Sequence, residues 1–481
     1  MPTQSSLRST DPTMAINQFL GQDGVGGGEA DRISALPDEL LHDILIHLRD
    51  TTEAARSSVL SRRWRRVWSG LPELCFLNNT VPAPAAAAHD CVDAALAACS
   101  APTIRRLEIE MLCPGVPSGH VSGWLRFASQ RLSGELRLSL PFEPPGRKKD
   151  VVLLPPCERV TALTLVLVRV LRFQLPPAGG TFTALIDVRI GTTYVIRGEL
   201  ERFVSTCCPR LKVLVLDCII IKDEDNVVLS IRSSSLERLE TNIFFDRAGR
   251  LHVDAPELQA FRQGAPCDFY ITSPKLSEVI WSDSCYDPNL HNFAAAGRHL
   301  RLLETDVGPS ALPLMRRFDT VDELFLEVNV DEGAEEYMIF LDNISKLPKC
   351  DVLVIRSLLI DHALNTTMLH LIRNCVGIRK LVLLPNWTKD DFQCKSPGCP
   401  CSLPEQTSND DVVLHSLEEV VVRNYGEADQ TVELVKLLCD CTAMFLKRVA
   451  ITISKCGQSS DMREKIHSII HPQNSKVEIN L

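Results

Sequence analysis

A short apolar pattern recurs along most of the chain, in the form apolar-x-x-apolar-x-apolar. Alternation of this kind is typical of a strand with one buried face. The clear copies are Ile104/Leu107/Ile109, Val160/Leu163/Leu165, Leu185/Val188/Ile190, Leu211/Leu214/Leu216, Leu276/Val279/Trp281, Val321/Leu324/Leu326, Cys350/Leu353/Ile355, Ile378/Leu381/Leu383, Leu417/Val420/Val422 and Leu446/Val449/Ile451. The weaker copies are Leu136/Leu138, Leu236/Leu239, Leu258/Phe261 and Leu300/Leu303.

The central residues of successive copies lie about 18 to 30 residues apart, with one interval of about 39 before Val420. This is the period of leucine-rich repeats, in which each unit adds one strand and a return segment and stacking builds the core. Helix-like segments such as residues 200–204 precede several copies. We therefore predict an α/β horseshoe with a parallel sheet on its concave side over residues 101–403. A set of unrelated β-rich domains and a β-helix are the alternatives.

The side chains between the inward positions are expected to face the concavity of this horseshoe. Examples are Val213, Val215, Glu323, Phe325, Val352 and Val354.

Helical periodicity marks the segment before the repeats. Apolar residues from Leu36 to Leu48 recur at steps that fit one helix face, and Pro37 suits the first helical position. Thr51 or Thr52 is expected to cap a second helix over residues 53–60, and Ser61 a third. On that third helix, Trp64, Val67, Trp68 and Leu71 share one face, and we interpret Arg62, Arg63, Arg65 and Arg66 as a solvated opposite face.

Two strings in this segment carry a family resemblance. Residues 31–41 read Asp-Arg-Ile-Ser-Ala-Leu-Pro-Asp-Glu-Leu-Leu, and residues 57–68 read Ser-Ser-Val-Leu-Ser-Arg-Arg-Trp-Arg-Arg-Val-Trp. Together they resemble a plant-type F-box over residues 31–76, although a second Leu-Pro, common in the family, is absent at Leu48-Arg49-Asp50. The resemblance implies docking on the Skp-family adaptor of an SCF-type cullin-RING ubiquitin ligase. The residues that it implies for adaptor binding are Leu36, Pro37, Leu40, Leu41, Ile44, Val59, Leu60, Trp64 and Trp68.

The remaining segments complete the predicted organisation. Residues 1–30 are Gly- and Ser-containing and predict a disordered tail, and residues 82–100 predict a linker and a first helix. Residues 207–218 resemble a repeat of plant F-box/leucine-rich-repeat proteins. Residues 404–481 resemble the FBD domain that often closes such chains, which implies an αβ cap on the solenoid.

Composition narrows the class of protein. The 481 residues are 45% hydrophobic, and 51 basic against 61 acidic residues give a net charge of −10, which argues against a nucleic-acid binder. No apolar stretch is long enough to predict a membrane span. The first 30 residues lack a secretory pattern, so we expect a cytoplasmic or nuclear protein whose 18 cysteines are reduced.

Candidate chemistry is sparse. Cys394-x4-Cys399-x-Cys401 invites a zinc interpretation, with a fourth ligand from Cys375, Cys439 or Cys441, but no spacing rule selects it. We expect free surface thiols there, and no metal or cofactor. His362 and His370 flank a Leu-rich helical stretch with no acid or nucleophile placed by spacing. Nucleotide-binding and hydrolase motifs are absent from the sequence, so we expect no enzymatic activity.

These observations favour a substrate-recognition subunit of an SCF-type ubiquitin ligase. Its N-terminal helices would hold the Skp-family adaptor, and its concave sheet would hold an unknown protein substrate. The alternatives are a non-catalytic scaffold that presents no substrate and a repeat module whose helical head packs in cis. Co-purification with the adaptor, and its loss on Leu36→Ala/Pro37→Ala substitution, separates the first two from the third. Neither nucleic acid nor membrane is an expected partner.

Overall fold

The computed structural model of the chain describes residues 33, 36–77, 85–112, 116–140, 150–167, 171–174, 181–222, 227–246, 248–282, 285–330, 333–360, 362, 364–374, 377–384, 396, 398–402, 416–424, 448–453 and 476–480. The predicted N-terminal tail and most of the FBD-like segment at 404–481 lie outside these residues. Cys375, Cys394, Cys439 and Cys441 lie outside them as well.

Short helices form the first part of the described chain. They are α2 (Asp38–His47), α3 (Thr51–Arg56), the 3-10 turn η1 (Ser57–Val59) and α4 (Arg62–Ser69). Ser61 caps α4 as predicted, its hydroxyl accepting from the Trp64 amide at 3.4 Å. The cap of α3 was expected at Thr51 or Thr52, but Asp50 fills this position by accepting from the Thr52 amide at 2.7 Å. Thr51 is instead the first residue of the helix, and its hydroxyl accepts from the Cys75 amide at 2.8 Å.

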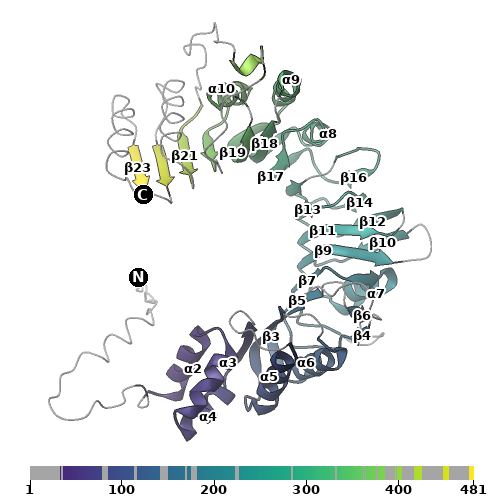
Figure 1. Cartoon of the computed structure of the whole chain (residues 1–481). Helices are drawn as coiled ribbons and strands as arrows, with labels where there is room; N and C mark the ends of the chain where they lie inside the picture. Colours follow the sequence, from purple (N-terminus) through teal and green to yellow (C-terminus); the bar gives the residue numbers. More distant parts are fainter. Residues whose placement is uncertain are drawn as a thin grey trace, which may run out of the picture.

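A long parallel sheet makes up most of the molecule. Its pairings run in the order β1-β2-β3-β5-β7-β9-β11-β13-β15-β17-β18-β19-β20-β21-β22-β23, and each neighbouring pair is parallel. The strands are β1 (Glu73–Leu77), β2 (Ile104–Glu110), β3 (Leu132–Leu140), β5 (Ala162–Leu167), β7 (Asp187–Gly191), β9 (Val213–Lys222), β11 (Arg238–Phe245), β13 (Ala260–Gln263), β15 (Glu278–Trp281), β17 (His299–Asp306), β18 (Thr320–Val330), β19 (Lys349–Ile360), β20 (Lys380–Leu383), β21 (Glu419–Asn424), β22 (Arg448–Ile453) and β23 (Lys476–Asn480). In Figure 1 these strands follow the inner side of an arc, α2 to α4 lie at its N-terminal end, and the later helices lie on its outer side.

The register of the sheet aligns the apolar positions found in the sequence. Leu107, Leu136, Leu163, Val188 and Leu214 pair across five successive strands, and all are buried. The residue two positions later in each strand forms a second buried row. The predicted inward pair of each unit therefore stacks on the pair of the next unit, which supplies the core that no single unit has. The predicted mixed α/β class is confirmed.

The second buried row is interrupted by three polar residues, one of which is Thr305 on β17. Thr241 on β11 and Gln263 on β13 occupy it, and both are buried. The Thr241 hydroxyl donates to Gln263 Oε1 at 2.7 Å, and the Gln263 amide donates to Cys267 Sγ at 3.3 Å and to the Ala265 carbonyl. These are the copies in which the sequence pattern lacks its third apolar position, so the weak copies are true strands with a polar residue inside.

Several of the described return segments are helical. The helices are α5 (Ala85–Ala98), α6 (Ser118–Arg131), α7 (Arg197–Arg202) with its continuation η2 (Phe203–Cys207), α8 (Leu312–Arg317), α9 (Ala334–Ile344) and α10 (Leu364–Asn374). The helix-like segment at 200–204 is therefore confirmed.

In the middle of the array the return segments are strands. A second parallel sheet contains β10 (Val227–Arg232), β12 (Gly249–Asp254), β14 (Asp268–Thr272) and β16 (His291–Ala294), and shorter pairings join β4 (Asp150–Leu153), β6 (Leu171–Gln174) and β8 (Tyr194–Ile196). Only 18 residues separate Phe261 from Val279, its partner on the next strand. A unit this short has no room for a helix of several turns, so its return is extended. In this region each unit contains two strands, as in the β-helix that was the alternative prediction.

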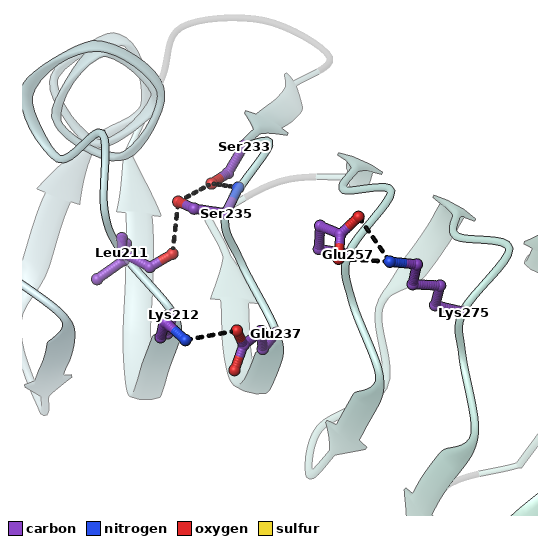
Figure 2. Close-up of polar contacts among 7 residues, drawn as sticks. All are labelled: Leu211, Lys212, Ser233, Ser235, Glu237, Glu257 and Lys275. Carbon is purple, nitrogen blue, oxygen red and sulfur yellow. Dashed lines mark hydrogen bonds and ion pairs between the residues drawn. The ribbon is translucent and has the colours of Figure 1, made fainter.

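Polar contacts between the turns tie neighbouring central units together. Lys212 Nζ lies 2.8 Å from Glu237 Oε1, and Lys275 Nζ lies 2.6 Å from Glu257 Oε2 (Figure 2). The Ser235 hydroxyl donates to a backbone carbonyl of the preceding unit at 2.8 Å. The two ion pairs are exposed and each contributes little, so the buried rows supply most of the cohesion between units.

The N-terminal helices are joined directly to the sheet. β1 follows α4 after three residues and pairs with β2. The Ser100 amide donates to the Ser69 carbonyl at 2.8 Å, and the Arg105 amide donates to the Pro72 carbonyl at 2.6 Å. The helices are therefore held at a fixed orientation to the array. Among the described residues, no helix has the length and apolar character needed to cross a bilayer.

Candidate functional site

The nine residues predicted to bind an adaptor fall into groups by exposure. The exposed members are Pro37, Leu40, Ile44, Val59 and Leu60. Leu36 and Trp68 are half-buried, whereas Leu41 and Trp64 are 0% and 6% exposed. Leu41 and Trp64 pack in the core beneath the helices, so their side chains are not available to a partner in this conformation.

Two exposed apolar segments remain on the helices. The α2 stripe consists of Leu40, Ile44 and Leu48, which are spaced four residues apart and so share one helix face. The Val59–Leu60 turn consists of the last residue of η1 and the residue after it, and its side chains are 83% and 67% exposed. Large apolar side chains this exposed, close together in one small segment, are typical of a protein interaction site.

Hydrogen bonds between α2 and α4 hold the chain that carries these side chains. Arg63 Nε and Nη2 donate to Asp38 Oδ1 at 3.0 and 2.6 Å, and Nη2 also donates to the Leu36 carbonyl. His42 Nε2 lies 2.9 Å from the Val67 carbonyl, which requires the ring to donate through Nε2. Arg63 was expected on a solvated face. Instead it fixes the Leu36-Pro37 corner against α4, a role that helical spacing alone does not indicate.

The turn after α2 contains a residue with a left-handed backbone. Arg49 has a φ of 53°, in the left-handed region that costs an ordinary residue about 1–2 kcal/mol. Its amide still donates to the Ile46 carbonyl at 3.0 Å. The chain therefore reverses at Leu48-Arg49-Asp50 without a second Leu-Pro and enters α3 through the Asp50 cap.

The inner face of the sheet carries different side chains at its two ends. Near the N-terminal end it is charged, with Arg106 2.8 Å from Glu135 and Arg137 3.3 Å from Glu108. Towards the C-terminal end the corresponding positions form an apolar row across β18 to β22. The members of this inner apolar row are Phe325, Val354, Val382, Val421 and Ala450.

Ion pairs border the inner apolar row. Arg356 Nη1 lies 2.6 Å from Glu304 Oε1, and its guanidinium lies 5.6 Å from the centre of the Phe325 ring. Glu419 lies between Lys380 at 3.0 Å and Arg448 at 2.8 Å. The inner face at this end therefore combines an apolar centre with paired charges at its margin, which is the usual composition of a protein-binding surface.

Several thiols in the described chain are unreactive at neutral pH. Burial, with a smaller contribution from Glu108, raises the pKa of the Cys75 thiol to about 11. Burial raises the pKa of Cys157 and of Cys350 to about 12. These thiols are neutral near pH 7 and are poor nucleophiles.

The cysteine cluster singled out in the sequence is buried, contrary to expectation. Cys399 and Cys401 were expected to be surface thiols, but they are 0% and 2% exposed. The reason is that residues 400–402 pack against α9 and α10. His362 lies beside both cysteines, whereas His370 is on α10 with its ring 6.2 Å from that of Tyr337.

A second polar cluster, absent from the sequence predictions, joins α5 and α6. His89, Asp90 and His120 place potential ligand atoms near one another. Asp93 accepts from Trp124 Nε1 at 2.7 Å and lies 2.6 Å from His120 Nδ1. These contacts hold the two helices together, and their residues are 27 to 31 positions apart, so local spacing could not reveal them.

Comparison with known proteins supports the features described above. Residues 33–76 match the F-box domain family. The chain is 30% identical over 237 residues to F-box protein At5g03100 of Arabidopsis thaliana, covering 49% of this chain and 70% of the relative. It is 29% identical over 249 residues to F-box/LRR-repeat protein 25 of the same plant, covering 50% of this chain and 90% of the relative.

A third relative carries the FBD name. F-box/FBD/LRR-repeat protein At5g56420 of Arabidopsis thaliana is 29% identical over 274 residues, which cover 54% of this chain and 58% of the relative. The F-box match covers the exposed apolar segments of α2 and of the Val59–Leu60 turn. Two of the relatives are named as LRR-repeat proteins, in agreement with the repeated strands that follow the F-box in this chain. The chain belongs to the F-box/FBD/LRR-repeat family of plant proteins.

Proposed function

We propose that this protein is the substrate-recognition subunit of an SCF-type cullin-RING E3 ubiquitin ligase. Its F-box docks on a Skp-family adaptor, and its repeat array binds a target protein in the cytoplasm or nucleus. The observation that carries the proposal is the exposure of Val59 and Leu60, at 83% and 67%, within a segment that matches the F-box domain family.

The exposed apolar residues make the direct contacts in this proposal. The α2 stripe, Pro37 and the Val59–Leu60 turn enter the adaptor's groove together with the accessible parts of Leu36 and Trp68. Burying each large apolar side chain contributes about 1.5–3 kcal/mol, so three or four of them support sub-micromolar binding after the cost of association. Leu41 and Trp64 contribute indirectly, because they hold the helices that present the contact residues.

The exposed side chains also argue against packing in cis. Within the part of the chain that the structure describes, the Val59–Leu60 turn and Leu48 are exposed, and the array contacts the helices elsewhere. The contacts between Ser69 and Ser100 and between Pro72 and Arg105 lie at the end of α4. A head that used its apolar surface to pack on the array would bury these side chains.

The repeat array is, in this proposal, a leucine-rich-repeat horseshoe closed by an FBD-like cap. The inner apolar row and its bordering ion pairs bind an exposed segment of the target with an apolar centre. The protein performs no covalent chemistry, because its contribution is to raise the concentration of the target near the ligase's catalytic module. The fixed junction between F-box and array supports this role, since it presents the bound target in a defined orientation.

Co-expression with a plant Skp-family adaptor tests the docking step. Val59→Glu/Leu60→Glu places two charges on the exposed turn and is expected to abolish co-purification with the adaptor. Met338→Glu is the matched control, because Met338 is 55% exposed on α9 and lies outside the F-box. The docking proposal fails if the double variant is folded and still co-purifies at the wild-type level.

Target presentation is tested separately from docking. Proximity labelling in plant cells compares the intact protein with Phe325→Glu/Val382→Glu, which places charges in the inner apolar row. We expect some proteins to be labelled only by the intact form and to be ubiquitylated in an adaptor-dependent manner. If both forms retain the adaptor and label the same proteins, the inner row does not bind the target. If labelled proteins are never ubiquitylated, the scaffold alternative holds.

A further inference from the structure

Two cysteines and a histidine from distant parts of the sequence meet inside the outer layer of the array. His362 lies just before α10, and Cys399 and Cys401 flank the first residue of the 3-10 turn η3 (Pro400–Ser402). His362 Nδ1 is 3.4 Å from Cys399 Sγ and 3.3 Å from Cys401 Sγ. His362 is fully buried, like the two cysteines.

Both sulfur atoms lie close to the same ring nitrogen. The Nδ1 atom of an imidazole has one site in the ring plane, which holds either a hydrogen or a lone pair. Two sulfur atoms approach this one nitrogen, so at most one of them makes a well-directed hydrogen bond. A cation between the three atoms would be bound by all of them at once.

The distances fit a zinc ion. Zinc binds sulfur at about 2.3 Å and nitrogen at about 2.0–2.1 Å in a tetrahedral arrangement, which separates the ligand atoms by about 3.6 Å. The two observed nitrogen–sulfur distances are close to this value, and the three ligand atoms all lie within 4.8 Å of one another. Thiolate and imidazole are also the ligand types that zinc prefers over magnesium or calcium.

We propose that His362, Cys399 and Cys401 bind a structural zinc ion. Binding deprotonates both thiols and leaves the imidazole neutral, so two protons are released for each zinc bound. Zinc takes four ligands, and these side chains supply three of them. Their burial leaves no path for a substrate, which makes the site structural and not catalytic.

The position of the site gives the metal a physical role. Its two cysteines lie in the longest repeat unit, where 39 residues separate Leu381 on β20 from Val420 on β21, and its histidine lies in the preceding unit. Within this long connection, η3 packs against α9 and α10. A zinc ion here ties this connection to the outer helices.

Buried neighbours hold the histidine in place. The Tyr337 ring on α9 lies 4.7 Å from the His362 ring, and the Thr367 hydroxyl on α10 donates to the Tyr337 hydroxyl at 3.3 Å. Both residues are completely buried. Residues from α9 and α10 thus support the imidazole around the ligand cluster, as is common for protein metal sites.

Metal analysis of the full chain, purified with its co-expressed adaptor from zinc-supplemented medium, tests the proposal. Mass spectrometry of the metal content is expected to find about one zinc per chain, and Cys399→Ser/Cys401→Ser and His362→Gln are expected to remove most of it. Cys350→Ser is the control, because Cys350 is a buried cysteine on β19 outside the cluster. Absence of zinc from the wild type, or its full retention in the cluster variants, overturns the proposal.

X-ray absorption at the zinc edge of the wild-type protein keeps the test independent of variant folding. At least two sulfur ligands and one imidazole nitrogen are expected around each zinc. A first shell of oxygen and nitrogen only would overturn the assignment, and so would a disulfide between Cys399 and Cys401 in the same sample. The F-box lies outside this region, so variants that lose zinc are expected to retain the adaptor, which separates this proposal from the proposed function.

Discussion

Arg63 on α4 donates two hydrogen bonds to one oxygen of Asp38 at the start of α2, at 3.0 and 2.6 Å. The same guanidinium donates to the Leu36 carbonyl. One side chain thus joins the third helix of the F-box to the Leu36-Pro37 corner from which α2 begins. The ion pair is partly exposed, so it contributes only moderately to the stability of the F-box. Its main effect is to fix the position of the corner relative to α4.

Arg63→Ala is expected to lower the opening free energy of α2 by about 1 kcal/mol, because the Leu36 carbonyl and the Asp38 carboxylate both lose a donor. Hydrogen exchange of the α2 amides measures this change. Arg62→Ala is the control, since Arg62 is exposed on the same helix and is expected to change the value by less than about 0.5 kcal/mol. Equal effects of the two substitutions would show that the Arg63 contacts do not hold the corner.

The buried Thr241–Gln263 pair is expected to act as a unit. Thr241→Val removes the donor to Gln263 Oε1 and leaves a buried acceptor unpaired, at a cost of about 1–3 kcal/mol. Gln263→Leu is expected to cost a similar amount, because the Ala265 carbonyl loses a donor. The loss of stability in the double variant is expected to be smaller than the sum of the two single losses, by about 1–2 kcal/mol. Chemical denaturation of all four proteins measures this coupling, and strictly additive effects would contradict it.

His291 on β16 is expected to make stability depend on pH. Burial is the main cause that lowers the pKa of its imidazole, and its Nδ1 accepts from the Asp287 amide at 2.9 Å, which requires the neutral ring. As the pH falls below about 6.5, the unfolded chain takes up the proton before the folded chain does. The contribution of His291 is thus fully present above this pH. It is lost progressively as the pH falls towards the lower folded pKa.

Melting temperatures on either side of about pH 6.5 measure this dependence. His291→Gln keeps a neutral acceptor for the Asp287 amide but does not titrate. This variant is expected to lose less stability on acidification than the wild type. Equal losses in the two proteins would mean that other groups cause the acid sensitivity.

The inward rows of the sheet were predictable because their cause is local. Leu107, Leu136 and Leu163 alternate with polar neighbours, and this alternation recurs at an interval that stacking requires. The return segments were less predictable, because the choice between helix and strand depends on the length of each unit. The helix-like spacing before Leu211 correctly predicted the helical segment formed by α7 and η2. The unit from Phe261 to Val279 is too short for such a helix, so its return segment is a strand.

Periodicity placed the F-box helices but could not separate their two sides. Leu40 and Leu41 are consecutive and equally apolar, yet Leu40 is exposed and Leu41 is buried. They are about 100° apart around the helix, and the apolar stripe is wide enough to include both. The cluster of His362 with Cys399 and Cys401 was beyond reach for a different reason. Its members are 37 and 39 residues apart, and only the packing of η3 on α10 brings them together.

The exposed turn provides the most direct test of the central claim, which is that the F-box docks on a Skp-family adaptor through its exposed apolar side chains. The measurement is the Kd of the purified adaptor for the wild type and for Val59→Ala/Leu60→Ala, by isothermal titration calorimetry. We predict a Kd weakened by about 10- to 200-fold, equivalent to about 1.4–3 kcal/mol, with an unchanged melting temperature, because both side chains are exposed in the free protein. A Kd within about twofold of the wild-type value would contradict the proposed docking surface.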